Sequence, residues 1–195
     1  MGIKKTLGLG VASAALGLSL IGGGTFAYFS DTAESTATFA AGTLDLNTNP
    51  EQNVNLSNLK PGDIAVRSFT LQNNGTLDIK ELKLATTYNV TDANTNNGSE
   101  DLGAHFKVKL LDSSYTSGPI TGHVVGEATL KDLQNNPGYD LVANAFPGGI
   151  SAAQSKTLKL AFEFVENGQD QNIFQGDSVA VTLTFNAKQG VGEFK

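Results

Sequence analysis

The two histidines are the side chains of this sequence best suited to acid–base or metal chemistry, because the 195-residue chain contains no cysteine. His105 comes directly before an alternating run that starts at Phe106, and His123 lies in a glycine-rich region after Pro119. They share no HExxH motif, in which two histidines on one helix face bind zinc. Two histidines also cannot form a three-histidine zinc site. We therefore expect both to be surface residues, and the chain to have no catalytic residue, metal site or cofactor.

A serine nucleophile requires a separate test, since serine, histidine and aspartate are all present. The sequence contains no Gly-x-Ser-x-Gly elbow, the motif that presents the nucleophile in one large hydrolase fold. Composition alone leaves a Ser-His-Asp triad open.

The polar stretch 92–101 resembles part of a calcium-binding loop. Asp92, Asn94 and Asn96 match the first three ligand positions of an EF-hand loop. The glycine required at the sixth position is Asn97, and the glutamate required at the twelfth is Gly103. We therefore expect a polar hairpin loop here instead of a calcium site.

Composition points to a β-rich protein that does not bind nucleic acid. Lys and Arg number 13 against 19 Asp and Glu, so the formal net charge is −6, which does not suit a polyanionic partner. Charged residues make up 16% of the chain, below the roughly 25% of an average domain, and glycine is abundant at 22 residues. This composition is typical of turn-rich extracellular proteins.

Residues 1–27 resemble a secretory signal sequence. Lys4 and Lys5 precede an apolar stretch at 7–21, and small residues lead to Ala27. A transmembrane anchor is the alternative, but the stretch is short for the about 20 residues that span a bilayer. We expect a signal peptidase to cleave between Ala27 and Tyr28, leaving a mature chain 28–195 without stable membrane insertion.

Apolar and polar residues alternate with a period of two through most of the mature chain, which predicts antiparallel strands. The clearest runs are 44–46, 64–71, 81–90, 106–110, 157–164 and 179–185. Pro61-Gly62 predicts a type II turn, and Asn-Gly pairs predict further turns. One short helix is expected at about 129–134, in a late crossover before the irregular loop 135–153. We predict a single all-β domain of about eight strands in a two-sheet sandwich, of either jelly-roll or immunoglobulin-like topology.

The segment directly after the predicted cleavage site is polar and only weakly alternating. It contains neither proline nor glycine, so it can adopt an extended conformation. Strands with weakly specified register tend to pair in alternative ways. The segment could add to an edge of its own sheet or to a neighbour's, or it could be a frayed terminus.

Several long blocks of the sequence strongly resemble the TasA/camelysin family. They are the signal region with Tyr28-Phe29-Ser30-Asp31, and the blocks 38–46, 58–63, 73–85 and 170–187. The resemblance implies a jelly-roll sandwich that is secreted, trimmed by a dedicated signal peptidase and assembled into extracellular biofilm fibres. It also implies growth by donor-strand complementation, in which the mature N-terminal segment of one subunit inserts into the next. The family carries a metallopeptidase label as well, for which this sequence offers no zinc motif.

Carried onto this chain, the resemblance implies that the donor strand is the first part of the mature protein. The donor residues would be Tyr28, Phe29, Ser30, Asp31, Thr32, Ala33, Glu34, Ser35, Thr36, Ala37 and Thr38. The expected partners are further copies of the chain, the signal peptidase and an accessory anchoring or assembly protein. We therefore expect a homopolymeric matrix protein at the cell surface. A secreted camelysin-type metallopeptidase and a monomeric adhesin are the alternatives.

Overall fold

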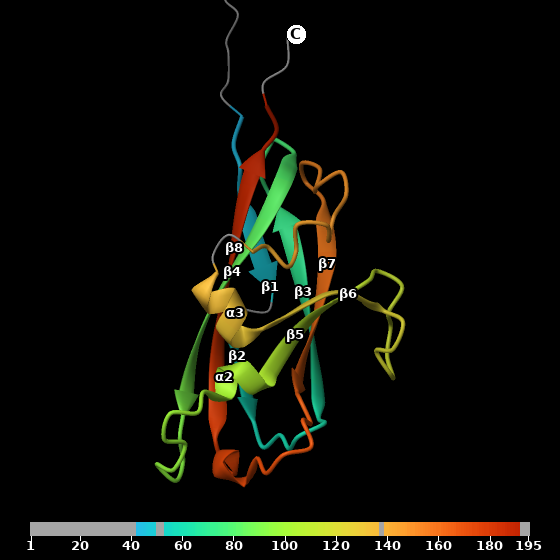
Figure 1. Cartoon of the computed structure of the whole chain (residues 1–195). Coiled ribbons are helices and arrows are strands. Elements are labelled where there is room, and N and C mark those ends of the chain that lie inside the picture. Colours follow the sequence, from blue (N-terminus) through green and yellow to red (C-terminus); the bar gives the residue numbers. More distant parts are fainter. Residues whose placement is uncertain (1–41, 50–52, 137–138, 192–195) are drawn as a thin grey trace, which may run out of the picture. The chain divides into compact units, whose positions relative to one another are not determined.

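The computed structural model describes residues 42–49, 53–136 and 139–191, which form eight strands and three short helical segments (Figure 1). The predicted signal sequence 1–27, its cleavage site at Ala27 and Tyr28, and the predicted donor segment 28–38 lie outside the described residues. Within the described ranges, no helix is both long and apolar enough to cross a membrane.

The strands form two antiparallel sheets, which confirms the predicted all-β, two-sheet architecture. The five-stranded sheet has the order β1 (Leu46–Asn49), β3 (Ile64–Asn73), β7 (Ser155–Phe164), β5 (Phe106–Leu111) and β6 (Val124–Thr129). The three-stranded sheet has the order β2 (Asn53–Ser57), β8 (Ser178–Gln189) and β4 (Ile79–Thr91). The chain therefore changes sheet between β1 and β2. Assignment to the jelly-roll type stays a prediction.

The inward faces of the two sheets form one hydrophobic core. Along β8, every second side chain from Val179 to Phe185 is buried, and the residues between them are exposed. Phe69 of β3 meets Phe185 of β8 across the sandwich, with 6.1 Å between the ring centroids. Alternation in the sequence therefore sets the core directly, since side chains in a strand point to opposite faces in turn.

The outer face of the five-stranded sheet is partly covered, which differs from the expectation of one wet face for each strand. Tyr115 and Ile120, from the loop between β5 and β6, pack with Leu111 and Ala161 in a second apolar cluster. Ala161 of β7 is fully buried although it alternates with core residues. The small side chain at position 161 leaves room for this loop to lie on the sheet.

One of the three helical segments was predicted. α3 (Leu130–Asn135) matches the helix expected at 129–134, and the side chain of Thr129 caps it by accepting a hydrogen bond from Asp132 N. The prediction of a single helix was wrong, because α2 (Leu102–His105) and the 3-10 segment η1 (Asn172–Phe174) were not expected. Each is about one turn long, which is too short to produce helical periodicity.

The turn at 60–63 agrees with its sequence. Gly62 has a φ of +90°, and Asp63 N donates to Lys60 O at 2.9 Å. Asn73, directly before the Asn74-Gly75 pair, is a fully buried residue at the end of β3. Its side-chain amide donates to the carbonyls of Leu77 and Ile150, and its Oδ1 accepts from Gly75 N.

Substituting Asn73 with alanine should therefore lower the free energy of unfolding by about 2–4 kcal/mol, because it removes three hydrogen bonds of a fully buried side chain. Urea unfolding of the mature chain measures the change. Asn74→Ala is the matched control, since Asn74 is exposed and should change stability by about 0.5 kcal/mol or less. Equal effects at both positions would contradict this role for Asn73.

Candidate functional site

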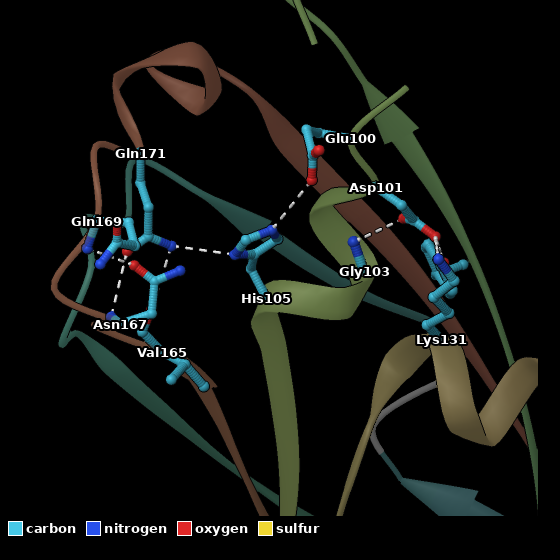
Figure 2. Close-up of polar contacts among 10 residues, drawn as sticks. Glu100, Asp101, Gly103, His105, Lys131, Val165, Asn167, Gln169 and Gln171 are labelled. Carbon is cyan, nitrogen blue, oxygen red and sulfur yellow. Dashed lines mark hydrogen bonds and ion pairs between the residues drawn. The ribbon is translucent and has the colours of Figure 1, made fainter. Parts of the chain in front are cut away.

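His105 ends α2 and lies in a network of polar and aromatic contacts (Figure 2). Its ring packs on Phe174 of η1, with 4.7 Å between ring centroids. Its Nδ1 lies 3.2 Å from Nε2 of Gln171, and its Nε2 lies 3.9 Å from a carboxylate oxygen of Glu100. The imidazole is half-buried, which corrects the expectation of a surface histidine. Because both ring nitrogens face protein groups, the ring serves mainly to join α2 to the loop before β8.

Asp101 fixes the short helix that carries His105. Its Oδ1 accepts from Gly103 N at 2.9 Å, and its Oδ2 accepts from the hydroxyl of Tyr88 at 2.7 Å. Burial and the bond to Asp101 raise the pKa of Tyr88. A side chain at position 103 would run into the Tyr88 ring. Glycine at 103 is thus required for packing, which explains why a calcium ligand is missing there.

His123 forms the second cluster, together with Asp112 and Ser114. His123 Nδ1 lies 3.1 Å from Asp112 Oδ2 and 3.3 Å from Ser114 Oγ, while Ser114 Oγ donates to Asp112 Oδ1 at 2.6 Å. In a catalytic triad, serine and aspartate contact opposite nitrogens of the imidazole. Here both contact the same nitrogen, and the serine proton is directed at the carboxylate. This arrangement holds the loop and does not activate a nucleophile.

Neither histidine has, among the described residues, the neighbours that a zinc site needs. Among the described residues, no group of three or more His, Asp or Glu side chains could hold a metal ion. Both histidines of the chain lie in the described part. A histidine-based zinc site would therefore have to use one of the two clusters above, and the described residues complete a site at neither of them.

The predicted hairpin loop 92–101 instead connects β4 to α2. The Asp92 carboxylate accepts hydrogen bonds from the backbone N–H groups of Asn94, Asn96 and Asn97. The bond from Asn97 has the largest effect, and together these bonds hold the pKa of Asp92 below its usual range. Asp177 then accepts from Ala93 N and from the Asn97 side chain. The carboxylates of Asp92 and Asp177 thus accept hydrogen bonds from backbone and amide groups of this loop, where a calcium loop would direct its oxygens at the ion.

The edges of the two sheets are the remaining candidate site, because an edge strand carries backbone groups that another strand can pair with. Described residues of the crossover between β6 and β7 cap the edge of β4 at three positions. Ile79 and Ile150 exchange two backbone hydrogen bonds, of 2.9 and 2.8 Å. Farther along, Leu84 N donates to Asp140 Oδ1 at 3.3 Å and Tyr88 N donates to Gln134 Oε1 at 2.9 Å.

The same crossover reaches the edge of the other sheet. The hydroxyl of Tyr139 donates to the backbone carbonyl of Glu127, in the middle of β6, at 3.3 Å. One segment of chain therefore supplies caps to both sheets on this side of the sandwich.

The other edge strands of the two sheets are the short strands β1 and β2 (Figure 1), which in the described chain pair with only part of β3 and β8. β2 pairs with β8 from Ser178 to Thr182, and no described strand continues this pairing along Leu183–Gln189. β1 pairs with β3 from Thr70 to Asn73, so the described chain also leaves the edge of β3 without a paired strand at Ile64–Phe69. Because β1 and β2 belong to different sheets, each sheet keeps one open stretch.

The register shows which backbone groups face the open stretch of β8. The capped N–H groups of Leu84 and Tyr88 point away from β8, and backbone groups alternate between the two sides of a strand. Residues such as Ala85 therefore face β8, where the partner of Ala85 is Thr184. It follows that Leu183 and its alternate neighbours direct their N–H and C=O groups to the open side, while their side chains enter the core.

Comparison with known proteins identifies related sequences. The family model described as camelysin metallo-endopeptidase matches residues 2–194. A relative from Bacillus subtilis (strain 168), described as a major biofilm matrix component, is 49% identical over 140 residues. The match covers 68% of this chain and 53% of the relative, so the chain spans about half the length of that protein.

Sequence reasoning selected both histidines and Asp92 but missed the residues that decide which edges are closed. Gln134, Tyr139 and Asp140 lie in or after a short helix and carry no motif. Only one signal was available, namely that the irregular loop 135–153 is unusually apolar. Leu141 and Val142 of this loop are buried in the core, which holds the capping side chains in place.

Asp92→Asn should lower the stability of the protein at pH 7. Folding lowers the pKa of this carboxylate, so its contribution is complete above the usual aspartate pKa of about 3.9. The contribution is lost as the pH falls through the lower pKa of the folded state. The difference between wild type and variant in urea midpoint should therefore shrink toward zero in strong acid. Asp45→Asn, at an exposed aspartate, is the control. A difference that persists unchanged at acidic pH would contradict the assigned role.

Proposed function

The chain belongs to the camelysin family, and from this we propose that it is a structural protein of the extracellular biofilm matrix. The half-covered sheet edge at β1 and β2 is the structural observation that supports the proposal. An edge that lacks a strand along part of its length can accept one from another chain. The name of the Bacillus subtilis relative indicates the setting in which such assembly would operate.

Assembly proceeds by donor-strand complementation. The signal sequence 1–27 is removed by a signal peptidase between Ala27 and Tyr28, which leaves the domain 28–195 with its donor segment Tyr28–Thr38 at the new N-terminus. The donor of one subunit pairs with the Leu183–Gln189 stretch of β8 in the next subunit. This contact joins different surfaces of the two copies and does not close on itself, so it produces filaments.

The proposed acceptor suits the chemistry of the donor. Leu183 and Phe185 direct their side chains inward, and Leu46 of β1 packs on the same core from the other sheet. Tyr28 and Phe29 are neighbours, and because neighbouring side chains of a strand point to opposite faces, one of the two rings faces the core. An aromatic side chain buries about 150–250 Å², so its burial at about 25 cal/mol per Å² contributes several kcal/mol, while backbone pairing to β8 supplies direction and register.

A camelysin-type metallopeptidase is the second candidate, and the description of the family model favours it. It would require a zinc site at His105 or His123, where the described side chains contact one another within the chain instead. Purified mature protein should therefore contain far less than one zinc per chain. An accessory anchoring protein is a further proposed partner, since a matrix fibre must be held at the cell surface.

Deleting residues 28–38 from the mature chain should abolish filaments and leave a folded monomer, because the donor is lost while the described sheets are kept. Electron microscopy and size-exclusion chromatography measure assembly, and the urea midpoint checks folding. Filaments of normal length from a folded deletion variant would overturn the donor assignment.

Disulfide trapping should locate the acceptor, because the chain contains no cysteine and introduced pairs report only designed contacts. Thr184→Cys lies on the exposed face of the open β8 stretch. Combined with single cysteines scanned through Ser30–Thr36, it should yield cross-linked ladders on non-reducing gels of filaments at one or two positions. Disulfides form only where Cα atoms lie about 4.4–6.8 Å apart, so the scan also gives the register.

Val125→Cys is the matched control, since Val125 is exposed on β6, the strand capped by Tyr139. It should yield no ladder. Ladders from Arg67→Cys, on the open stretch of β3, in place of Thr184→Cys would transfer the acceptor to the other sheet and overturn the assignment to β8.

A further inference from the structure

Three Asn-Gly pairs occur in the described chain, at 74–75, 97–98 and 167–168. An asparagine followed by glycine is prone to a side reaction, because the glycine has no Cβ to hinder its backbone nitrogen from approaching the asparagine side-chain carbon. The local structure then decides which pair reacts. The three pairs differ sharply in exposure and in hydrogen bonding.

The pair at 167–168 has its reacting groups arranged by neighbouring residues. Gly168 N, the nucleophile, donates a hydrogen bond to a carboxylate oxygen of Glu166 at 2.7 Å. Asn167 Oδ1 accepts from Gln169 N at 2.9 Å, as Figure 2 shows. A base thus contacts the nucleophile, while a donor polarises the amide carbonyl to be attacked. All four residues from Glu166 to Gln169 are exposed to water.

Gln171 keeps this loop in place. It is a buried side chain, only 8% exposed, and its amide nitrogen contacts both Val165 O and Nδ1 of His105, each at 3.2 Å (Figure 2). Its Oε1 faces Asn167 N at 3.5 Å. The side chain of Gln171 therefore joins the two ends of the loop 165–171, and its contact with His105 fixes it in place.

We propose that Asn167 is a site of self-catalysed deamidation, with Glu166 as the general base. Glu166 accepts the proton of Gly168 N as this nitrogen forms a bond to Asn167 Cγ. The C–N bond to the side-chain amide then breaks, and ammonia leaves with the proton that Glu166 returns. The cyclic imide that results is opened by water, which gives aspartate or isoaspartate at position 167. The net reaction consumes one water and releases one ammonia, with no oxidant or reductant.

The other two pairs lack this arrangement. Asn97 is only 9% exposed, and its side-chain nitrogen, the leaving group, donates to Asp177 at 2.7 Å. Gly75 is buried, and its N–H donates to the neutral amide oxygen of Asn73. Neither nucleophile is bonded to a carboxylate in the described contacts, so both pairs serve as internal controls within one molecule.

The product changes both charge and backbone. Aspartate at 167 places a third carboxylate in a loop that already contains Glu166 and Asp170. Isoaspartate also adds a methylene to the backbone between Val165 and Gln171, which are joined by the hydrogen bond from Gln171 Nε2 to Val165 O. We therefore expect the modified loop to lose its contact with His105.

Peptide mapping by mass spectrometry of the folded mature protein, incubated at pH 7.5 and 37 °C, tests the proposal. Asn167 should deamidate roughly tenfold faster than Asn74 or Asn97, a modest gain beside the 100-fold or more typical of a positioned general base. Glu166→Gln, which keeps the size of the side chain, should remove most of this advantage at Asn167. It should leave the rates at the other two sites unchanged.

Incubation in urea separates structure from local sequence. If the folded loop provides the catalysis, the three rates should approach one another once the protein is unfolded. Rates that are equal in the folded protein, an unchanged rate in Glu166→Gln, or an advantage that persists in urea would each overturn the proposal. Gly168→Ala should also slow the reaction at Asn167 relative to the wild type, because the added Cβ hinders the approach of the backbone nitrogen. Circular dichroism checks that this variant is folded.

Discussion

The backbone hydrogen bonds at the sheet edges are the constraint on which the arrangement of this protein depends. Every buried N–H and C=O must find a partner, and an unpaired strand edge invites other strands. On one side of the sandwich the crossover 130–150 meets this need with Gln134, Asp140 and Tyr139. These side chains hold their positions because Leu141 and Val142 of the same segment are buried in the core. Burial of the apolar residues of this segment thus fixes the polar side chains that cap the strands.

The side that carries β1 and β2 is arranged differently. One continuous strand there could have covered the edge of a single sheet, but the chain divides it into β1 and β2 on different sheets. Two open stretches of similar length result, at Leu183–Gln189 and Ile64–Phe69. The described chain thus caps parts of two edges with side chains and leaves parts of the other two without a paired strand. This difference between the two sides supports the proposed pairing between subunits.

The long strands could be predicted from the sequence, while the site could not. Alternation located β3, β4, β5, β7 and β8, because each buries one face in a common core. It placed β1 too early, at 44–46, since the strand begins only where Leu46 meets Asn73. α2 and η1 were missed because a single turn has no period. The histidine clusters and the edge caps escaped because they join residues distant in sequence, such as Tyr88 and Gln134, for which the chain carries no local signal.

Chain direction favours a donor from a second copy over the chain's own N-terminal segment. β1 starts at the end of β3, and the turn after β3 leads to β4, whose first residue Ile79 pairs with Gln189 at the end of β8. Gly42, the first described residue, thus lies near the end of the sandwich where β8 finishes. Gly42–Asp45 is held there, since carbonyls in it accept from Asn74, Thr76 and Leu77.

If the chain before Gly42 paired with its own β8, it would run parallel to β8. β2, in contrast, is antiparallel to β8, and parallel pairing is slightly less stable per residue. A strand from another copy could extend β2 in the antiparallel sense. This geometry supports the proposal that the stretch Leu183–Gln189, which no described strand pairs, accepts a strand from a neighbour.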